Sequence, residues 1–348
     1  MPEDSIEHID FDQLNKRAIS QPLVSHIYTA DPSAHVFNGK IYIYPSHDIE
    51  AGVPFDDLGS HFAMEDYHVL SMDSPDGEAI DHGVALHVDD VPWAKQQMWA
   101  PDATEKDGTW YLFFPAKDHE GVFRIGVASS SSPAGPFTPQ PEPIIGSFSI
   151  DPAVFKDDDG SYYIYFGGIW GGQLQRWRTG AFKAEGDGPL VHLPKDNEPA
   201  LCAKVARLSD DLLAFSEAPK DVVILDENGQ PLLQGDNDRR FFEASWIHKY
   251  NGRYYFSYST GDTHYICYAV GDNPYGPFTY KGVILNPVVG WTSHHSITEF
   301  NGRWYLFYHD SSLSKGITHL RSVKVTELTH KEDGTIQIIN PYRENGLQ

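Results

Sequence analysis

The sequence predicts an all-β fold, a five-bladed β-propeller, on three observations. A hairpin unit recurs five times, and each copy has a strand, a tight turn ending in glycine and a second strand rich in aromatic residues. Helical periodicity is scarce, whereas Tyr, Phe and Trp, which favour strands, make up 13% of the chain. The stretches between successive hairpins each leave room for about four strands, the size of a propeller blade.

The five turns carry the hairpin prediction. Each reads Asn-Gly or Asp-Gly between strand-like residues, which is the strongest short-range hairpin signal. The turn glycines are Gly39, Gly108, Gly160, Gly252 and Gly302. An all-β sandwich with chance turns of this kind is the alternative, but the matching aromatic second strands favour the propeller.

The segments between the hairpins complete the blades. Residues 130–137 resemble residues 271–278, and both follow an alternating strand, so each unit is predicted to be a four-stranded antiparallel meander. We expect a long loop over 49–66 and place the mixed segment 190–238 in the fourth blade. No linker composition divides the chain, so residues 1–348 are expected to form a single propeller domain.

Composition limits the partners. The chain has 26 basic and 49 acidic residues, a formal charge of −23, which disfavours nucleic acid and anionic membranes and suits a neutral ligand. Two cysteines are too few for a disulfide framework, and no apolar run of about 18 residues indicates a membrane span. The first eight residues are acidic and lack the apolar core of a secretory signal, so we expect a cytoplasmic protein.

A polar residue stands at the head of the first strand in every hairpin unit. Because the innermost strand of each blade lines the central channel of a propeller, these heads are expected to converge at one end. They are Asp31, Asp102, Asp151, Glu243 and His294. Carboxylates held close together push their pKa values apart, which is what a general acid and a general base need at neutral pH.

Each carboxylate also has a plain structural interpretation, since Asp at a strand head often forms a turn or a cap. Asp102 lies closer to its turn glycine than the others, so the structural interpretation is favoured there. Asp31 and Asp151 share an Asp-Pro pattern, and Glu243 lies in a Phe-Glu-Ala segment. These three are the predicted catalytic residues.

Five motifs, taken in this order, resemble those of glycoside hydrolase family 43, in its β-xylosidase and α-L-arabinofuranosidase members. The resemblance covers nearly the whole chain, from about residue 28 to residue 336. The motifs are Ala30-Asp31-Pro32, Met98-Trp99-Ala100-Pro101-Asp102, Ile150-Asp151-Pro152, Phe242-Glu243-Ala244 and His294-His295-Ser296. The family fold is a five-bladed propeller, in agreement with the hairpin pattern.

The resemblance implies an inverting mechanism with three roles. Asp31 would be the general base that activates water, Glu243 the general acid that protonates the leaving oxygen, and Asp151 the residue that orients the acid and tunes its pKa. His294 matches a channel histidine that in this family often binds a calcium ion or its water shell. A buried histidine hydrogen-bonded to backbone is the equal alternative, because calcium prefers several oxygens. No organic cofactor is expected.

Four further residues are predicted to contact the sugar. Trp99 follows from the second motif, and Trp170 lies in a glycine-rich segment; both could stack on a ring, although core packing or a tight turn explains them equally well. His47 lies just past a strand end. Arg321 resembles an arginine that reaches the sugar in family β-xylosidases, although a lone arginine on a strand is more often at the surface.

These observations favour an exo-glycosidase that releases xylose from β-1,4-xylo-oligosaccharides and also acts on α-L-arabinofuranosides. The loop over 49–66 would wall off the channel mouth and admit only a chain end. An arabinan-degrading arabinofuranosidase or arabinanase is the alternative within the family. A non-catalytic sugar-binding propeller is the rival from another class, but it would not need three carboxylates. A metal-dependent hydrolase is disfavoured, since no His-x-His or Cys cluster has ligand spacing. The oligomeric state stays open.

Overall fold

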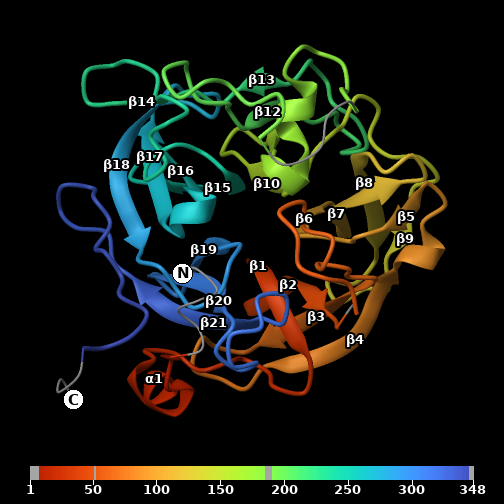
Figure 1. Ribbon diagram of the computed structural model, residues 1–348. Helices are drawn as coiled ribbons and strands as arrows, with labels where there is room; N and C mark the ends of the chain where they lie inside the picture. The colour runs from red at the N-terminus through yellow and green to blue at the C-terminus, as the bar shows by residue number, and fades with distance from the viewer. Residues whose placement is uncertain (1–7, 51, 185–189, 345–348) are drawn as a thin grey trace.

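Five sheets stand radially around a central space in the computed structural model, which describes residues 8–50, 52–184 and 190–344 (Figure 1). Each sheet runs outward from an inner strand, as in a propeller blade. The predicted five-bladed propeller is therefore confirmed. The expectation of no secretory signal rests on the first eight residues of the chain. Residues 1–7 lie outside the part that the structure describes.

The blades follow the chain order. The first contains β1 (Tyr28–Phe37), β2 (Lys40–Asp48), β3 (Asp66–Met72) and β4 (Ile80–His87). The second contains β5 (Ala94–Gln96), β6 (Asp102–Lys106), β7 (Thr109–Asp118), β8 (Phe123–Ser130) and β9 (Thr138–Pro139). The third contains β10 (Ala153–Lys156), β11 (Tyr162–Phe166), β12 (Lys204–Arg207) and β13 (Lys220–Asp221).

The last two blades depart from the four-stranded pattern. The fourth contains β15 (Glu243–Tyr250), β16 (Arg253–Ser259), β17 (Ile266–Gly271) and β18 (Phe278–Leu285), and β14 (Ile224–Leu225) pairs with β18 in parallel. The fifth contains β19 (His295–Phe300), β20 (Arg303–Asp310) and β21 (Ser322–Leu328). Short helical elements are α1 (Phe11–Arg17), η2 (Val88–Asp90), η3 (Trp170–Gly172), η4 (Leu174–Trp177) and η5 (Gly261–Thr263).

The hairpin turns form where their residues predict them. At the first, Phe37 pairs with Lys40, and both residues between them are left-handed, with φ of 52° at Asn38 and 77° at Gly39. Two left-handed residues make a type I′ turn, whose twist matches that of the flanking strands. Asn and Gly are the residues that adopt this conformation most readily, so the local sequence determines the register of the blade's inner strands.

The segment before β1 closes the ring. The backbone N–H of Leu23, in this segment, donates to Val323 O at 2.9 Å, and that of Thr29, at the start of β1, donates to Arg321 O at 2.9 Å. This N-terminal segment therefore lies along β21 and covers the outer side of the three-stranded fifth blade. The chain then enters β1, so the first blade is fastened directly beside the last.

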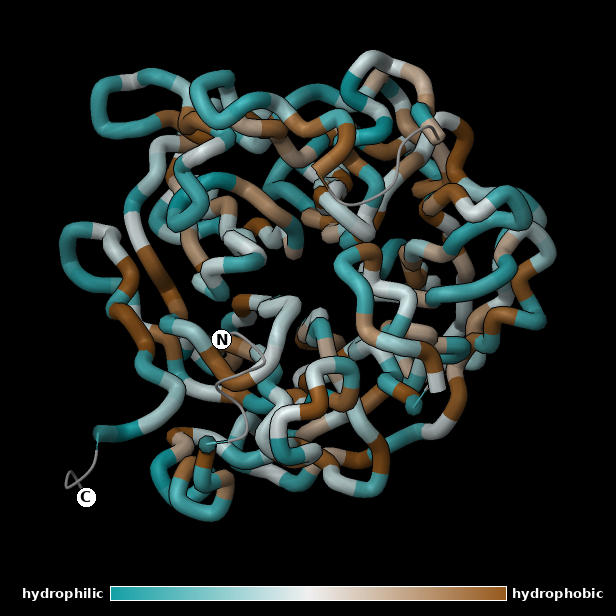
Figure 2. The backbone as a smooth tube through the Cα atoms, in the orientation of Figure 1, coloured by the Kyte–Doolittle hydropathy of each residue, from teal (hydrophilic) through white to brown (hydrophobic). Residues whose placement is uncertain are grey.

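The placement of segment 190–238 in the fourth blade is wrong for most of its length. Its strands β12 and β13 complete the third blade, and only β14 joins the fourth. A long segment separates β11 from β12, the third strand of that blade. Position along the chain therefore assigned β12 to the wrong blade. Apolar residues follow the strands, and hydrophilic residues gather in outer loops (Figure 2). Among the described residues, no helix has the length and apolar character needed to cross a membrane.

Candidate active site

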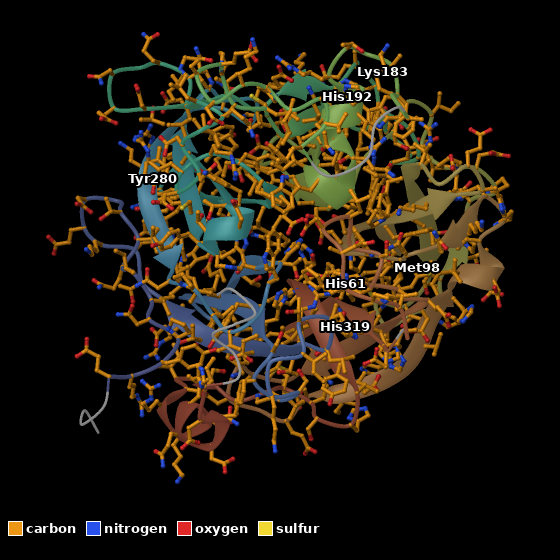
Figure 3. The ribbon with its side chains drawn as sticks, in the orientation of Figure 1. His61, Met98, Lys183, His192, Tyr280 and His319 are labelled. Carbon is orange, nitrogen blue, oxygen red and sulfur yellow. The ribbon has the colours of Figure 1, made fainter. Side chains whose placement is uncertain are left out.

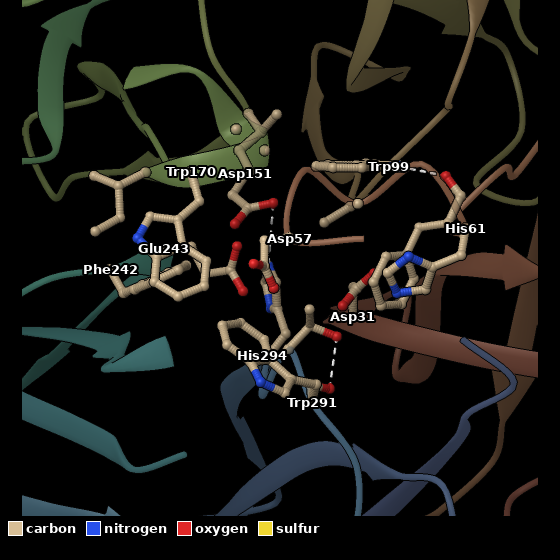
Figure 4. Close-up of a pocket in the computed structure, with 18 of the residues that line it drawn as sticks. Asp31, Asp57, His61, Trp99, Asp151, Trp170, Phe242, Glu243, Trp291 and His294 are labelled. Carbon is tan, nitrogen blue, oxygen red and sulfur yellow. Dashed lines mark hydrogen bonds and ion pairs between the residues drawn. The ribbon is translucent and has the colours of Figure 1, made fainter. Parts of the chain in front are cut away.

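A pocket opens where the inner strands begin, and it contains four of the five predicted heads. Asp31, Asp151, Glu243 and His294 all line it (Figure 4). The space inside the pocket, counted together with the open solvent at its mouth, is about 660 Å³. The topology thus brings together three carboxylates from the first, third and fourth blades.

The backbone turns sharply at these heads. Asp31 and Asp151 are left-handed, with φ of 51° and 56°, and so is Ala244, with φ of 66°. The strand register shifts around Asp31 and again after Glu243, as at a β-bulge. Such conformations cost about 1–3 kcal/mol for residues other than glycine and gather at functional sites. Here they re-aim the side chains at the strand heads.

Asp31 is buried and held by three groups. Its Oδ1 accepts a hydrogen bond from Arg321 Nη1 at 3.0 Å, and its Oδ2 accepts one from Ser46 Oγ at 2.7 Å. Its backbone N–H donates to His309 Nδ1 at 2.9 Å. Burial raises the pKa of Asp31, but the Arg321 guanidinium, helped by the hydrogen bond from Ser46, outweighs it and holds the pKa below its ordinary value. Asp31 is therefore ionised, as a general base must be.

Arg321 is itself fixed from the other side. Its Nε and Nη2 donate to the two oxygens of Asp48, both at 2.8 Å, in a bidentate pair that is almost fully buried. Its Nη1 also donates to Thr292 Oγ1 at 2.9 Å. The structure thus places the predicted sugar-contacting Arg321 in the pocket wall, where its strongest contacts are carboxylates.

Glu243 and Asp151 are two buried acids with unequal surroundings. Burial raises the pKa of Glu243 well above its ordinary value, and the charges of Asp151 and Asp31 add to this effect. Burial and the charge of Asp31 also raise the pKa of Asp151 well above its ordinary value, although its Oδ2 accepts the Ala244 N–H at 2.8 Å, which partly stabilises its anion. Because the Ala244 N–H favours the anion of Asp151, Glu243 is the acid of the two that we place in the protonated state, which a general acid needs.

His294 lines the pocket next to Asp151. The His295 N–H donates to His294 Nδ1 at 2.8 Å, so in the neutral ring Nε2 carries the hydrogen. Nε2 lies 3.9 Å from Asp151 Oδ1 and has no hydrogen-bond partner among the described residues. Burial lowers the pKa of His294, which keeps the ring neutral. Its Nε2–H is placed to donate to a ligand hydroxyl.

The residues around His294 do not fit a calcium ion. Calcium takes about six to eight oxygen ligands, whereas Nε2 is a donor in this tautomer. The neighbouring Asp31 carboxylate already accepts hydrogen bonds at both oxygens, and Asp151 accepts one. The side chains around His294 thus supply too few oxygen ligands to hold a calcium ion by themselves.

Asp102, the fifth head, does not line the pocket. It is fully buried, and its Oδ1 lies 2.6 Å from His35 Nε2. Its Oδ2 accepts the Val154 N–H at 2.6 Å. Asp102 thus links β6 to β1 and β10, so the structural interpretation favoured from its spacing agrees with its contacts.

Aromatic rings form two walls of the pocket (Figure 4). Trp99 stands on one side, where its Nε1 donates to Phe62 O at 2.8 Å. On the other side Trp170, Phe242 and Trp291 lie with ring centroids 5.2–5.6 Å apart. Trp99 and Trp170 both line the pocket, and both also pack against neighbouring aromatic rings. Flat apolar faces of this kind suit sugar rings.

The loop after β2 forms the rim, as its position predicts. Phe55, Asp57 and His61 from this loop line the pocket. It meets the glycine-rich segment on the opposite side, because a Cβ on Gly171 would lie 2.5 Å from Leu58 O. His61 also contacts His319, with ring centroids 5.7 Å apart, so the loop rests on the fifth blade (Figure 3).

His47 is the predicted sugar contact that the structure does not bring to the pocket. Its Nδ1 lies 2.5 Å from Asp66 Oδ1, and its ring contacts His68. Successive strand residues point to opposite faces, so His47 faces away while Asp48 beside it binds Arg321. The assignment of His47 to the sugar pocket is therefore corrected.

Three residues that support or line the site are not among those predicted from the sequence. Asp48 and His309 hold Arg321 and Asp31 from behind, and Trp291 completes an aromatic wall. Trp291 could have been found, because it stands three residues before a strand head. Asp48 and His309 carry no local signal, since their roles depend on contacts between the first and fifth blades.

Comparison with known proteins gives a consistent result. Residues 21–336 match the family model described as Glycosyl hydrolases family 43. A xylosidase/arabinosidase 43A of Humicola insolens is 62% identical over 92% of this chain and 99% of its own length. A xylosidase/arabinosidase of Bacteroides ovatus is 60% identical over 90% of this chain and 95% of its own.

Solved structures show the same likeness. A β-xylosidase/α-arabinofuranosidase from a compost microbial metagenome, in complex with xylotriose and in a calcium-free form, has a TM-score of 0.91 and 68% identity. The alignment covers 93% of this chain and 98% of that one. A Xanthomonas citri enzyme complexed with xylotriose has a TM-score of 0.90 and 57% identity, covering 97% of this chain and 98% of that one.

Proposed function

The chain belongs to glycosyl hydrolases family 43 and is a glycoside hydrolase. On this basis we propose that it releases xylose from the ends of β-1,4-xylo-oligosaccharides. We further propose a side activity on α-L-arabinofuranosides. The close relatives named xylosidase/arabinosidase and the xylotriose and xylose complexes of similar structures support this substrate class.

The main support for this proposal is that two carboxyl groups in one pocket, those of Asp31 and Glu243, have opposite protonation preferences. Arg321 lowers the pKa of Asp31 against the effect of burial, whereas burial and the charge of Asp151 raise the pKa of Glu243. Two carboxyl groups with separated pKa values supply a base and an acid in the same pH range. A binding protein has no need of this arrangement.

We propose that the reaction inverts the anomeric centre. Asp31 would take a proton from a water molecule as that water attacks the anomeric carbon. Glu243 would donate its proton to the glycosidic oxygen as the bond from that oxygen to the anomeric carbon breaks. Asp31 ends protonated and Glu243 ends ionised, so the proton count balances. Asp151 would keep Glu243 protonated between cycles through its negative charge.

The pocket supports exo action. The rim loop and the glycine-rich segment meet through Leu58 and Gly171, which bounds the site on the side of Trp99. A bounded pocket accepts a chain end rather than the middle of a polymer. His61 and His294 each present a buried Nε2 that has no partner among the described residues, and both suit sugar hydroxyls.

Activity on a substrate panel tests the proposal. Nitrophenyl β-xylosides and α-L-arabinofuranosides, xylo-oligosaccharides and linear arabinan would be compared, and the anomer first formed would be read by NMR. We expect turnover of the xyloside above the arabinoside, xylose as the first product and α-xylose as the initial anomer. Higher activity on arabinan would overturn the substrate assignment, and initial β-xylose would overturn inversion.

A further inference from the structure

We propose that the first blade carries a second site, unrelated to the sugar pocket, that binds a divalent transition-metal ion of the zinc class. Its ligands are His47, Asp66 and His68, which we call the blade-1 triad. The potential ligand atoms of these three residues all lie within 4.8 Å of one another. The blade-1 triad is separate from the proposed glycosidase site, because none of its three residues lines the sugar pocket.

The sheet geometry brings the triad together. His47 lies in β2, while Asp66 and His68 lie two residues apart in β3 and so share one face of the strand. His47 Nδ1 lies 2.5 Å from Asp66 Oδ1, and the rings of His47 and His68 are 4.5 Å apart with an interplanar angle of 61°. The ligands therefore come from two neighbouring strands, which a search for His-x-His along the sequence does not find.

A second layer of contacts orients the triad as metal sites require. His68 Nδ1 lies 2.8 Å from Asp81 Oδ1, so a ring that donates there keeps a lone pair on its other nitrogen. A histidine that is a metal ligand typically donates its other N–H to a carboxylate in this way. Asp81 Oδ2 also lies 2.7 Å from His26 Nε2, in the segment that precedes β1. The site is thus tied to the N-terminal segment.

The surroundings favour entry of a cation. The side chains of His47, Asp66 and His68 are 16%, 15% and 12% exposed, so solvent reaches them although they are largely covered. Asp66 and Asp81 add two carboxylates, and the whole chain carries a formal charge of −23. In the absence of metal, His47 and Asp66 are joined by a hydrogen bond, and a bound ion would replace the proton of that bond.

The donor set selects the ion. Two imidazoles and one carboxylate suit zinc, cobalt or nickel, with water completing the coordination, whereas calcium and magnesium prefer oxygen throughout. The triad lies on the face of β3 that carries Leu70 and Met72, whose cluster includes Val24 from the N-terminal segment. A bound ion would therefore fasten the seam where the propeller closes, so we assign it a stabilising role.

The experiment measures zinc binding and thermal unfolding of the full chain after removal of metals with a chelator. We expect one Zn²⁺ per chain by calorimetry and a rise in Tm of about 2 °C or more at saturating Zn²⁺, reversed by the chelator. Co²⁺ should give visible absorption of a nitrogen- and oxygen-ligated ion without the bands of a thiolate, which separates the triad from the two cysteines.

Matched variants identify the site. His47→Gln and Asp66→Asn should remove the zinc-dependent rise in Tm, and Asp81→Asn should weaken binding about 10–100-fold, as loss of an outer partner does. His87→Ala changes another histidine of the same blade, and His294→Ala changes the pocket; both should bind Zn²⁺ as the parent does. Equal binding by parent, His47→Gln and Asp66→Asn, or no binding by the parent, would overturn the proposal. Loss of binding in His294→Ala alone would place the ion in the pocket instead.

Discussion

Arg321 Nη1 lies 3.0 Å from Asp31 Oδ1, although 290 positions separate the two residues in the chain. The contact exists because closure of the propeller places β21 beside β1. It joins a buried cation to the proposed general base, and Asp48 holds the guanidinium on its other side. Fold closure and the ionisation of the base therefore depend on the same side chain.

Replacing Arg321 should shift the pH profile. In Arg321→Gln the positive charge that lowers the pKa of Asp31 is lost, so the acidic limb of kcat/KM should move to higher pH. Arg321 also opposes the raised pKa of Glu243, so the basic limb should move upward as well. Arg321→Lys keeps the charge and serves as the control. A profile that stays in place in Arg321→Gln would show that Arg321 does not set the ionisation of Asp31.

The same substitution should destabilise the fold. Asp48 would remain buried without a counter-charge, and breaking a buried ion pair costs about 3–5 kcal/mol. Urea unfolding of Arg321→Gln therefore belongs beside the kinetics, and the pH profile is measured at a temperature where the variant remains folded.

Glu243→Ala should discriminate between leaving groups. Protonation of the leaving oxygen matters most when that oxygen is basic, so xylobiose hydrolysis should fall by about 10²–10⁴-fold. An activated nitrophenyl xyloside should lose much less. The two substrates are compared by kcat on the same preparation. Equal losses on both would remove Glu243 from the role of general acid.

Asp151→Asn isolates the effect of its charge. The amide oxygen of asparagine still accepts the Ala244 N–H, so the backbone contact survives. The negative charge that helps to raise the pKa of Glu243 is gone, so the basic limb of the pH profile should move to lower pH. Burial, the larger cause, would keep part of the elevation. If the basic limb does not move, burial and the charge of Asp31 maintain the proton on Glu243 without help from Asp151.

Asp102→Ala should affect stability rather than chemistry. The change leaves the Val154 N–H and the His35 ring without their buried partner, at a cost of about 3 kcal/mol in the free energy of unfolding. At a temperature where the variant is folded, kcat/KM should stay within a few-fold of the parent. A loss as large as that of Glu243→Ala, with an unchanged Tm, would make Asp102 a catalytic residue.

The sequence predicted the features that local signals and repetition determine. Asn-Gly and Asp-Gly turns located the hairpins, and their repetition placed Asp31, Asp151 and Glu243 at one end of the inner strands. The contacts that tune these groups could not be predicted in the same way. Asp48 and His309 meet Asp31 and Arg321 only because the first and fifth blades are adjacent.

His47 shows why proximity along the chain misleads. It is adjacent to Asp48, yet alternation along β2 turns the two side chains to opposite faces of the blade. One supports the pocket through Arg321, and the other contacts Asp66 and His68. The pairing of β1 with β2 shifts between Ala30 and Ser33, close to the partners of these two residues, and no local motif encodes that irregularity.

The substitution Gly171→Ala tests whether the rim loop closes one end of the pocket. A Cβ at this position would lie 2.5 Å from Leu58 O, closer than real Cβ contacts, so Gly171→Ala must push the rim loop outward. Because the φ of Gly171 lies outside the left-handed region, the substitution strains the contact with Leu58 rather than its own backbone. We expect a higher KM for xylotriose with little change in kcat, since Asp31 and Glu243 stay in place. Tm measured on the same samples separates opening of the rim from general loss of stability.

Digestion of xylohexaose provides the decisive measurement: the parent should release xylose from the first minutes, and the variant should begin to form internal fragments. Internal fragments from the parent itself would show that the site is an open cleft.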